Sequence, residues 1–457
     1  MSQIGVFLLA DYTKSWLKSG ILEELSSCST VTVFGHEAVI TSIKKDLPKI
    51  RTNTIPFNAL SKTTYHLQQI ALINRRKKSS SFQFRLKRTI FGELRVFPKT
   101  RKFSLGLFPI YYNLKRLIKY IITHPLELLS FIPWFGLILE KYLRKKFFRI
   151  SISKFTQMDS LQDIDLALLP SAAIENQVFE MLHYLKSEGV RTVLCIENWD
   201  NLTSKSVLIA EPDYVFVMGQ FCATHGVSIQ NLSPAKIRVA GIPRFNPYRK
   251  EILKSKAFRA NKSYKKIRVL YLGFSVPHCE IDLLNEIIRL LEVSNLGNLY
   301  EFSYKPHPVR QPRFYESNFL SEKIHTIGTD LELSGFKAIP AIDQNHIQHI
   351  LDADLVISTP TSMAIECMML QKPIIIDATD DGIHRTTAGK SLKNYVHLQD
   401  LHKINGLSFG YSASDIVSKI ISFDFKEDLQ KKLNLETLIE NAEPSYVQHI
   451  LGLVNNH

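Results

Sequence analysis

Short β-branched runs, each followed by a segment with helical patterning, recur along this 457-residue chain and constrain its fold more than any other feature. A strand, a helix and a second strand at this spacing are typical of parallel α/β units. The first series of predicted strands covers residues 4–10, 31–34, 165–169, 191–196, 214–218 and 236–240. The first half of the chain is therefore predicted to form an open parallel sheet with helices.

A second series of the same kind begins at residue 267. Its predicted strands cover residues 267–273, 302–305, 355–358 and 373–377, and an amphipathic helix is expected over 280–293. Residues 246–266 between the two series are polar and basic. Since the chain is also too long for one domain, we predict an α/β fold of two Rossmann-like domains, 1–245 and 267–457. Residues 246–266 would be the linker, and a deep cleft would lie between the domains.

Positive charge is concentrated in one segment of the first domain. The net charge of +14 comes from residues 75–149, which hold 19 basic and 3 acidic residues, whereas the remainder holds 38 and 40. The segment also contains many aromatic and aliphatic residues, and Pro125 and Pro133 would divide it into two or three short helices. We predict a basic amphipathic helical insertion that docks on an anionic membrane surface. The residues expected to bind the membrane are Arg75, Arg76, Lys77, Lys78, Arg85, Lys87, Arg88 and Trp134.

The same segment is compatible with two further roles. It could be a buried helical insertion whose charges are merely solvated. Basic residues interleaved with aromatic ones could also bind RNA, but no nucleic-acid motif supports this, so no nucleic-acid partner is expected.

Several classes of protein are disfavoured by what the chain lacks. Its five cysteines are widely spaced, without zinc-ligand spacing, and no Asp-x-Asp motif follows a predicted strand. We therefore expect no disulfide framework, no metal site and no cofactor beyond a substrate. The N-terminal residues have the pattern of a first strand and not of a signal peptide. No apolar run is long enough for a helix that spans a membrane, so a cytoplasmic protein is expected.

Two motifs directly follow predicted strands of the second domain. Ligands of open parallel sheets bind outside the carboxyl ends of the strands. The first motif, Tyr304-Lys-Pro-His-Pro308, places Lys305 and His307 where they could donate to an anion. Alternatively, this motif could be a simple turn.

The second motif, about fifty residues later, is Ser358-Thr-Pro-Thr-Ser362 followed by Met-Ala-Ile-Glu366. Hydroxyl groups and free N–H groups at a helix start suit a phosphate. Glu366, one turn further on, could accept hydrogen bonds from ribose hydroxyls. Alternatively, Ser362 could act only as the helix N-cap.

With these two motifs, the second half of the chain resembles GT-B glycosyltransferases of the bacterial surface-polysaccharide type. This group includes capsule Kdo transferases, polysialyltransferases and CDP-glycerol glycerophosphotransferases. The resemblance is carried by YKPHP and by the run from Ile357 to Asp377, and it covers roughly residues 190–380. One departure is Gln371, where the group usually has a glycine before the last strand.

The resemblance implies which residues would hold the phosphates of a nucleotide-activated donor, a nucleotide sugar or CDP-polyol whose base stays unspecified. They are Lys305, His307, Ser358, Thr359, Thr361 and Ser362, with Arg244 of the Gly241-Ile-Pro-Arg-Phe hinge nearby. It also implies inverting, metal-independent transfer to a glycan or lipid-linked acceptor in capsule or lipopolysaccharide synthesis, on the inner face of the cytoplasmic membrane.

An inverting transfer needs a base to take the proton of the acceptor hydroxyl. Asp200, Glu197 and Asp11 all follow predicted strands of the first domain, and Asp200 is the preferred candidate. Asp200 and Glu197 belong to the motif Glu197–Lys205, which resembles one in glycosyltransferase-like proteins of polysaccharide gene clusters and could alternatively be a capped helix start.

Two further classes of function remain open. A non-hydrolysing nucleotide-sugar 2-epimerase shares the two-domain fold but uses no acceptor. A non-catalytic protein would bind a nucleotide or glycan without turnover.

Overall fold

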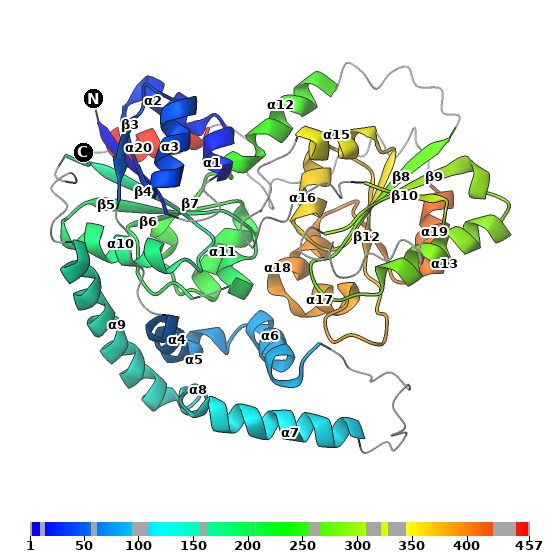
Figure 1. Cartoon of the computed structure of the whole chain (residues 1–457), viewed down its shortest axis with the longest axis horizontal. Helices are drawn as coiled ribbons and strands as arrows, with labels where there is room; N and C mark the ends of the chain where they lie inside the picture. Colours follow the sequence, from blue (N-terminus) through cyan, green and yellow to red (C-terminus); the bar gives the residue numbers. More distant parts are fainter. Residues whose placement is uncertain are drawn as a thin grey trace. The chain divides into compact units, whose positions relative to one another are not determined.

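The computed structural model of the chain describes residues 2–9, 14–55, 62–93, 108–155, 161, 163–205, 207–255, 266–307, 321–327, 344–423 and 445–455 (Figure 1). It divides into two compact units. The first contains residues 1–83, 121–246 and 436–457, and the second contains residues 84–120 and 247–435.

The first unit is built on a seven-stranded parallel sheet in the order β3-β2-β1-β4-β5-β6-β7. Its central strands are almost wholly buried and apolar, as expected for a parallel sheet covered on both faces. The strands are β1 (Gln3–Leu8), β2 (Thr30–Gly35), β3 (Arg51–Thr54), β4 (Leu166–Ser171), β5 (Arg191–Ile196), β6 (Tyr214–Val217) and β7 (Ile237–Val239).

Helices cover both faces of this sheet (Figure 1). One apolar core joins alternate residues of β1, such as Ile4 and Val6, to helices on one face, while α10 and α11 lie on the other. The helices are α1 (Lys14–Lys18), α2 (Ile21–Cys28), α3 (Glu37–Asp46), α10 (Asn176–Ser187), α11 (Gln220–Ser228) and α20 (Tyr446–Asn455).

Helix α20 comes from the far end of the chain. Tyr446, Val447 and Ile450 are buried in the core of the first sheet, and the ring of Tyr446 packs edge-on against Trp16 and Phe216. The predicted second domain extended to residue 457, whereas this last helix packs with the first unit.

The second unit is built on a six-stranded parallel sheet in the order β10-β9-β8-β11-β12-β13. The described strands are β8 (Ile267–Leu272), β9 (Tyr300–Lys305), β10 (Ile324–Thr326), β11 (Leu355–Ser358), β12 (Ile374–Asp377) and β13 (Ser408–Gly410). The predicted α/β fold with two parallel sheets is confirmed.

Helices also cover both faces of the second sheet (Figure 1). α13 and α19 share an apolar core with β8, β9 and β11 on one face, and α15 and α16 lie on the other. The helices are α13 (Glu280–Val293), α15 (Gln344–Asp352), α16 (Ser362–Met369), α17 (Ala388–Asn394), α18 (Val396–Gln399) and α19 (Ala413–Ile421).

A long helical insertion separates β3 from β4 in the sequence. It contains α4 (Lys62–Ala71), α5 (Ile73–Arg76), α6 (Ser80–Phe91), α7 (Phe108–Thr123), α8 (Pro125–Leu129) and α9 (Pro133–Phe155). Both Pro125 and Pro133 are first residues of helices, where a missing N–H costs nothing. The expectation of short helices is wrong for α9, which runs for 23 residues, because Pro133 begins it and no later residue breaks it.

Residues 84–120 of the insertion group with the second unit. The carbonyl and carboxylate of Glu93 accept hydrogen bonds from the backbone N–H of Arg385 (2.8 Å) and from the Thr386 hydroxyl (3.1 Å). Asn113 of α7 accepts from the Arg385 guanidinium at 3.1 Å. A segment predicted to belong wholly to the first domain therefore contacts the loop after β12.

The predicted linker is partly helical. Residues 246–255 form α12 (Asn246–Ser255), and residues 256–265 lie outside the described residues. Within the described part of the chain, none of the helices combines the length and the apolarity that crossing a membrane requires.

Gln371, the departure from the expected glycine, has left-handed backbone geometry. It follows the end of α16 with φ of 54°, and its side chain is exposed. The N–H groups of Gln371 and Lys372 bond back to Met368 and Cys367, as in a helix end that normally takes glycine.

Gln371→Gly should therefore raise the free energy of unfolding of the second unit by about 0.5–1 kcal/mol, because glycine adopts positive φ without strain. Urea unfolding followed by far-UV circular dichroism would measure this, since all three tryptophans lie in the first unit. Asn295→Gly, at φ of 58°, is the matched control and should gain less, because asparagine tolerates this geometry. A loss of stability in Gln371→Gly would contradict the expectation.

Candidate functional site

The carboxyl ends of β8, β9 and β11 meet at one edge of the second sheet, where main-chain hydrogen bonds tie them together. Leu272, which ends β8, accepts bonds from the N–H and the hydroxyl of Thr359, both at 3.1 Å. Gly273 donates its N–H to the carbonyl of Lys305 at 2.9 Å. A Cβ on Gly273 would lie 3.1 Å from the backbone nitrogen of His307, so the close approach favours glycine. The two predicted motifs thus flank the same strand end.

Lys305 is the last residue of β9, and His307 lies just beyond it. The Lys305 side chain is largely buried, and its Nζ lies 3.5 Å from Nδ1 of His349 on α15. His307, two residues beyond the strand, is partly exposed. The ammonium of Lys305 and the imidazole of His307 at one strand end can donate hydrogen bonds to an anion such as a phosphate.

The four hydroxyl residues after β11 divide into two pairs. Ser358 and Thr359 are fully buried, and their hydroxyls donate to the carbonyls of Thr359 (2.9 Å) and Leu272 (3.1 Å). Thr361 and Ser362 are partly exposed at the start of α16. Of the four residues, Ser362 therefore offers the more accessible hydroxyl for a ligand.

The N-cap of α16 is Thr361 rather than Ser362, and its side chain makes no capping hydrogen bond. Its Oγ1 is buried without a hydrogen-bond partner among the described residues. The alternative in which Ser362 serves only as the N-cap is therefore wrong, because the helix begins at that residue.

Glu366 lies one turn into α16 and is mostly buried. Its Oε2 is 2.8 Å from Nε2 of His346 on α15. The carboxylate thus has a protein partner, and its predicted contact with a ribose remains a prediction.

A buried polar network that the sequence did not predict lies at the same edge, after β8 and β12. Asp377, the last residue of β12, accepts hydrogen bonds from the Tyr271 hydroxyl (2.6 Å) and the Thr379 hydroxyl (2.7 Å). Nε2 of His278 lies 3.3 Å from the same carboxylate. Burial disfavours the charged imidazolium, but the nearby carboxylates of Asp377 and Asp381 outweigh it and raise the pKa of His278 to about 10.

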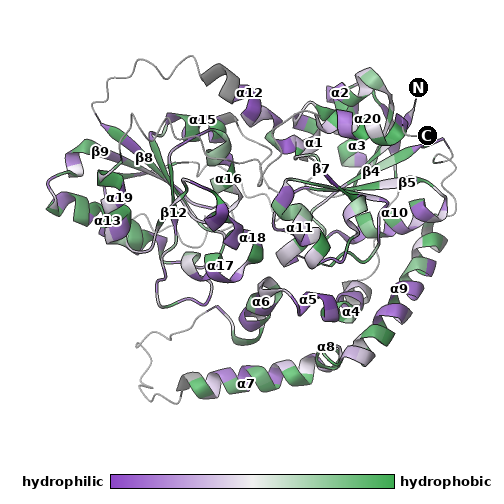
Figure 2. Cartoon of the chain, turned by 180° about the vertical axis from the view of Figure 1, so that it is seen from behind, coloured by the Kyte–Doolittle hydropathy of each residue, from purple (hydrophilic) through white to green (hydrophobic). Residues whose placement is uncertain are grey.

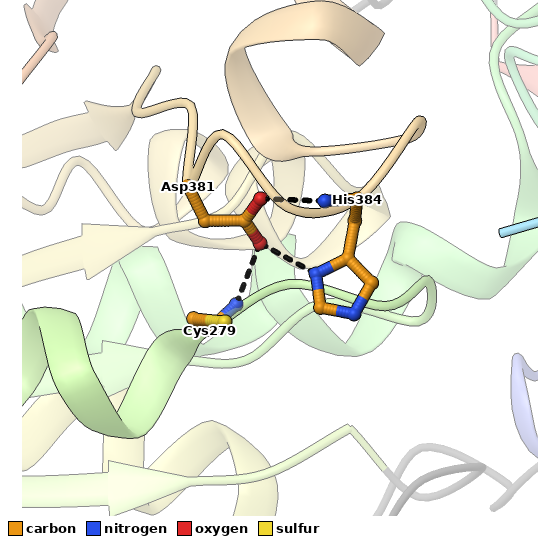
Figure 3. A group of neighbouring side chains, drawn as sticks. All are labelled: Cys279, Asp381 and His384. Carbon is orange, nitrogen blue, oxygen red and sulfur yellow. Dashed lines mark hydrogen bonds and ion pairs between the residues drawn. The ribbon is translucent and has the colours of Figure 1, made fainter. Parts of the chain in front are cut away.

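Asp381, next to this network, also contacts Cys279 and His384 (Figure 3). Its Oδ2 accepts hydrogen bonds from the backbone N–H of Cys279 (3.1 Å) and from Nδ1 of His384 (2.6 Å), and lies 3.6 Å from Nδ1 of His278. Burial alone would raise the pKa of Asp381, but the neighbouring His278 and the hydrogen bonds from His384 hold that pKa well below its usual range.

Cys279, Asp381 and His384 have side-chain types that bind transition metals, and their ligand atoms lie within 4.8 Å of one another (Figure 3). The imidazole nitrogen that faces Asp381 already donates to it, and Asp381 also accepts from the Cys279 backbone. These bonds account for the arrangement without an ion. The sequence contained a signal for this polar cluster. Three aspartates and a histidine lie within residues 377–384, which start at the last residue of β12.

Of the predicted bases, Glu197 is buried inside the first unit. Its carboxylate accepts hydrogen bonds from Trp16 Nε1 (2.7 Å) and the Ser15 hydroxyl (3.0 Å). Burial raises the pKa of Glu197 to about 7, against the opposing effects of these bonds and of Arg244. Its carboxyl group is therefore closed off by its own donors in this structure.

Asp200 is the more accessible candidate base. Its carboxylate lies 3.3 Å from Nζ of Lys205, and its side chain is 16% exposed. Residues 201–205 form a single π-helical turn, fixed by Gln230, whose Nε2 donates to the carbonyl of Leu202 at 2.7 Å. The third candidate, Asp11, lies outside the described residues.

Arg244 belongs to the first unit, where its guanidinium lies over the ring of Phe245 at 4.8 Å. It is close enough to Glu197 to lower the pKa of that carboxyl. Its predicted contact with donor phosphates stays a prediction.

Most of the basic residues predicted to bind a membrane already have partners. Arg75 pairs with Glu140 (3.2 Å), Arg88 lies 3.5 Å from Glu93, and Lys77 donates to the carbonyl of Phe131 (3.1 Å). Arg76 stacks on Phe82, and Arg85 is half-buried. Among the eight, the exposed side chains are Lys78, Lys87 and Trp134.

The chain is similar in fold to several solved structures. A Listeria monocytogenes protein assigned as a UDP-N-acetylglucosamine 2-epimerase matches with a TM-score of 0.50 and 10% identity, over 99% of this chain and 95% of that one. The Neisseria meningitidis UDP-GlcNAc 2-epimerase bound to UDP-GlcNAc matches with a TM-score of 0.50 and 12% identity, over 99% of both chains. MurG of Acinetobacter baumannii matches with a TM-score of 0.47 and 9% identity, over the whole of both chains.

No protein-family model and no curated protein sequence matches the chain. At these identities the structural matches show a two-domain GT-B-like fold. This fold occurs in both glycosyltransferases and nucleotide-sugar epimerases, so it leaves the choice between them open.

The buried Glu197 should make the first unit less stable as the pH rises. Its pKa of about 7 in the folded state exceeds its ordinary 4.5. Between these values the folded state binds more protons than the unfolded state, so stability falls with rising pH, by up to about 3 kcal/mol for this group.

Urea unfolding followed by tryptophan fluorescence at pH 5 and pH 8 would measure this loss of stability. Glu197→Gln should flatten the pH dependence, whereas Glu188→Gln, at an exposed carboxylate of the same unit, should not. An unchanged pH slope in Glu197→Gln would show that another group is responsible.

Proposed function

We propose that this protein is a glycosyltransferase that moves a sugar or a polyol phosphate from a nucleotide-activated donor to a surface-polysaccharide or lipid-linked acceptor. The observation that carries the proposal is the arrangement at the carboxyl end of β8. Lys305 and His307, at the end of β9, lie on one side of it, and the helix start at Thr361–Ser362, after β11, lies on the other. Cationic donors beside a helix N-terminus suit a diphosphate.

In this proposal the chain's residues divide the chemistry between them. A base, with Asp200 preferred, takes the proton of the acceptor hydroxyl. The acceptor oxygen then bonds to the anomeric carbon of a nucleotide sugar, or to the polyol-bearing phosphorus of a CDP-polyol, as the bond from that atom to the leaving nucleotide breaks. The electron pair leaves with the nucleotide. Lys305, His307 and the N–H groups at the start of α16 stabilise the charge that develops on the leaving phosphate, so that no metal is required.

The donor side is better supported than the acceptor side. CDP-polyols and nucleotide sugars share the diphosphate that this edge suits, so the site geometry does not select the base or the sugar. We place the enzyme at the inner face of the cytoplasmic membrane, in capsule or lipopolysaccharide synthesis, because a lipid-linked acceptor would be found there.

The second candidate function is a non-hydrolysing nucleotide-sugar 2-epimerase. It is favoured by the two matches at a TM-score of 0.50, both to proteins assigned that activity. An epimerase would alter the sugar of the donor with no acceptor present, and this difference separates the two candidates.

The donor site can be tested by thermal-shift titration with CMP, CDP, UDP, GDP and dTDP. A nucleotide at about 100 times its Kd stabilises the folded state by roughly 2.7 kcal/mol. We expect one nucleotide to shift the transition, and His307→Ala to weaken its binding at least about tenfold by removing a charge-assisted donor.

His325→Ala, at an exposed histidine of β10 in the same unit, is the matched control and should bind like the unaltered protein. An unchanged titration in His307→Ala would remove that residue from the donor site. The responding nucleotide sugar would then be incubated without an acceptor, where an epimerised sugar would establish the second candidate instead.

A further inference from the structure

Helix α7 carries an exposed apolar face that nothing in the described structure covers. Six large apolar side chains on it are 45–71% exposed. At about 100° per residue they fall within roughly 120° of the helix circumference. They are Ile110, Tyr111, Leu114, Ile118, Ile121 and Ile122.

The rest of α7 is arranged around this face. Lys115 and Lys119 are both exposed and follow the apolar arc along one border. On the opposite side Tyr120 is buried and Asn113 accepts the bond from Arg385. The helix thus contacts the rest of the unit through one side, and its apolar side is exposed. Figure 2 shows hydrophobic and hydrophilic residues alternating along the α7 ribbon.

Helix α9 repeats the arrangement in the first unit. One side packs Leu143 and Phe147 into a cluster with Ala71. The exposed side begins apolar, with Trp134, Leu137, Ile138 and Tyr142, and then turns basic, with Lys145, Lys146 and Arg149. Leu126, Leu129 and Ile132, on and after α8, are exposed as well.

We propose that these faces of α7 and α9 insert into the surface of an anionic lipid bilayer. Large apolar side chains beside lysines and aromatic rings match the depth profile of a lipid interface, with hydrocarbon below and charged headgroups above. Both helices lie within the segment 75–149 that the sequence predicts to dock on a membrane, and Trp134 is one of the predicted residues. The proposal moves the contact away from the basic cluster at residues 75–88, most of whose side chains have protein partners.

Charge selects the lipid surface over a second copy of the chain. Residues 108–155 hold nine basic and two acidic residues, so two such faces would oppose like charges. An anionic bilayer supplies both apolar contact and counter-charge. The proposal rests on the proposed function for one point only, that the acceptor is linked to lipid.

The chain contains its own reporter of insertion. Of its three tryptophans, Trp16 and Trp199 are buried and Trp134 is 65% exposed. Phosphatidylglycerol vesicles should therefore shift the emission of Trp134 to shorter wavelength, and Trp134→Phe should abolish the shift. Vesicles of phosphatidylcholine alone should bind less, because they offer no counter-charge.

The decisive variant is the triple substitution Leu114→Gln, Ile118→Gln and Ile122→Gln, which keeps helix propensity and removes apolar area. Cosedimentation with phosphatidylglycerol vesicles should fall at least about tenfold. The matched control, Val293→Gln with Leu299→Gln and Tyr411→Gln, changes exposed apolar residues elsewhere in the second unit and should leave binding unchanged.

Equal vesicle binding by both triple variants, or no binding by the unaltered protein, would overturn the proposal. So would a dimer, seen by light scattering, that the α7 variant alone dissociates. Nucleotide titration of the same preparations separates this result from the proposed function. A variant that binds nucleotide but not vesicles supports the surface, whereas vesicle binding without any nucleotide response would count against the transferase alone.

Discussion

The paired burial of His278 and Asp377 is the interaction that ties together the strand ends at the carboxyl edge of the second sheet. A charge removed from water costs several kcal/mol unless an opposite charge and further hydrogen bonds compensate it. Here Tyr271 and Thr379 complete the shell of Asp377, and Asp381 approaches the other imidazole nitrogen. The network joins the loop after β8 to the loop after β12, so neither can move without exposing an unpaired charge.

This network lies beside the two sequence motifs and is connected to them through the main chain. The loop after β8 carries Gly273 and follows Leu272, and the backbone groups of these residues bond to the ends of β9 and β11. Fixing that loop therefore fixes Lys305 and Thr359 as well. Rigid placement of donors is what recognition of a diphosphate requires, because preorganised groups lose little entropy on binding.

The pKa values of the buried carboxyl groups in the two units shift in opposite directions. Asp377 is kept charged by a cation beside it. Glu197 accepts its hydrogen bonds from the neutral groups of Trp16 and Ser15, and burial raises its pKa to about 7 despite the nearby Arg244. The first arrangement suits a fixed electrostatic frame. The second gives the first unit a group that titrates near neutral pH, in the segment that also contains Asp200.

The sequence by itself determined the two parallel sheets, the strand ends that carry the motifs and the helical character of the insertion. These follow from local patterns: β-branched runs, helical periodicity and prolines at helix starts. The glycine departure at Gln371 was also visible, and its positive φ explains why glycine would be usual there.

Only the tertiary structure decided which groups are available for function. Ser358, Thr359 and Glu197 look like ligands or bases in the sequence, but backbone carbonyls or buried donors already engage them. The His278 network, the placement of α20 on the first sheet and the free faces of α7 and α9 were equally unpredictable. Each depends on contacts between residues far apart in the chain, and local patterning contains no information about the partner that burial will supply.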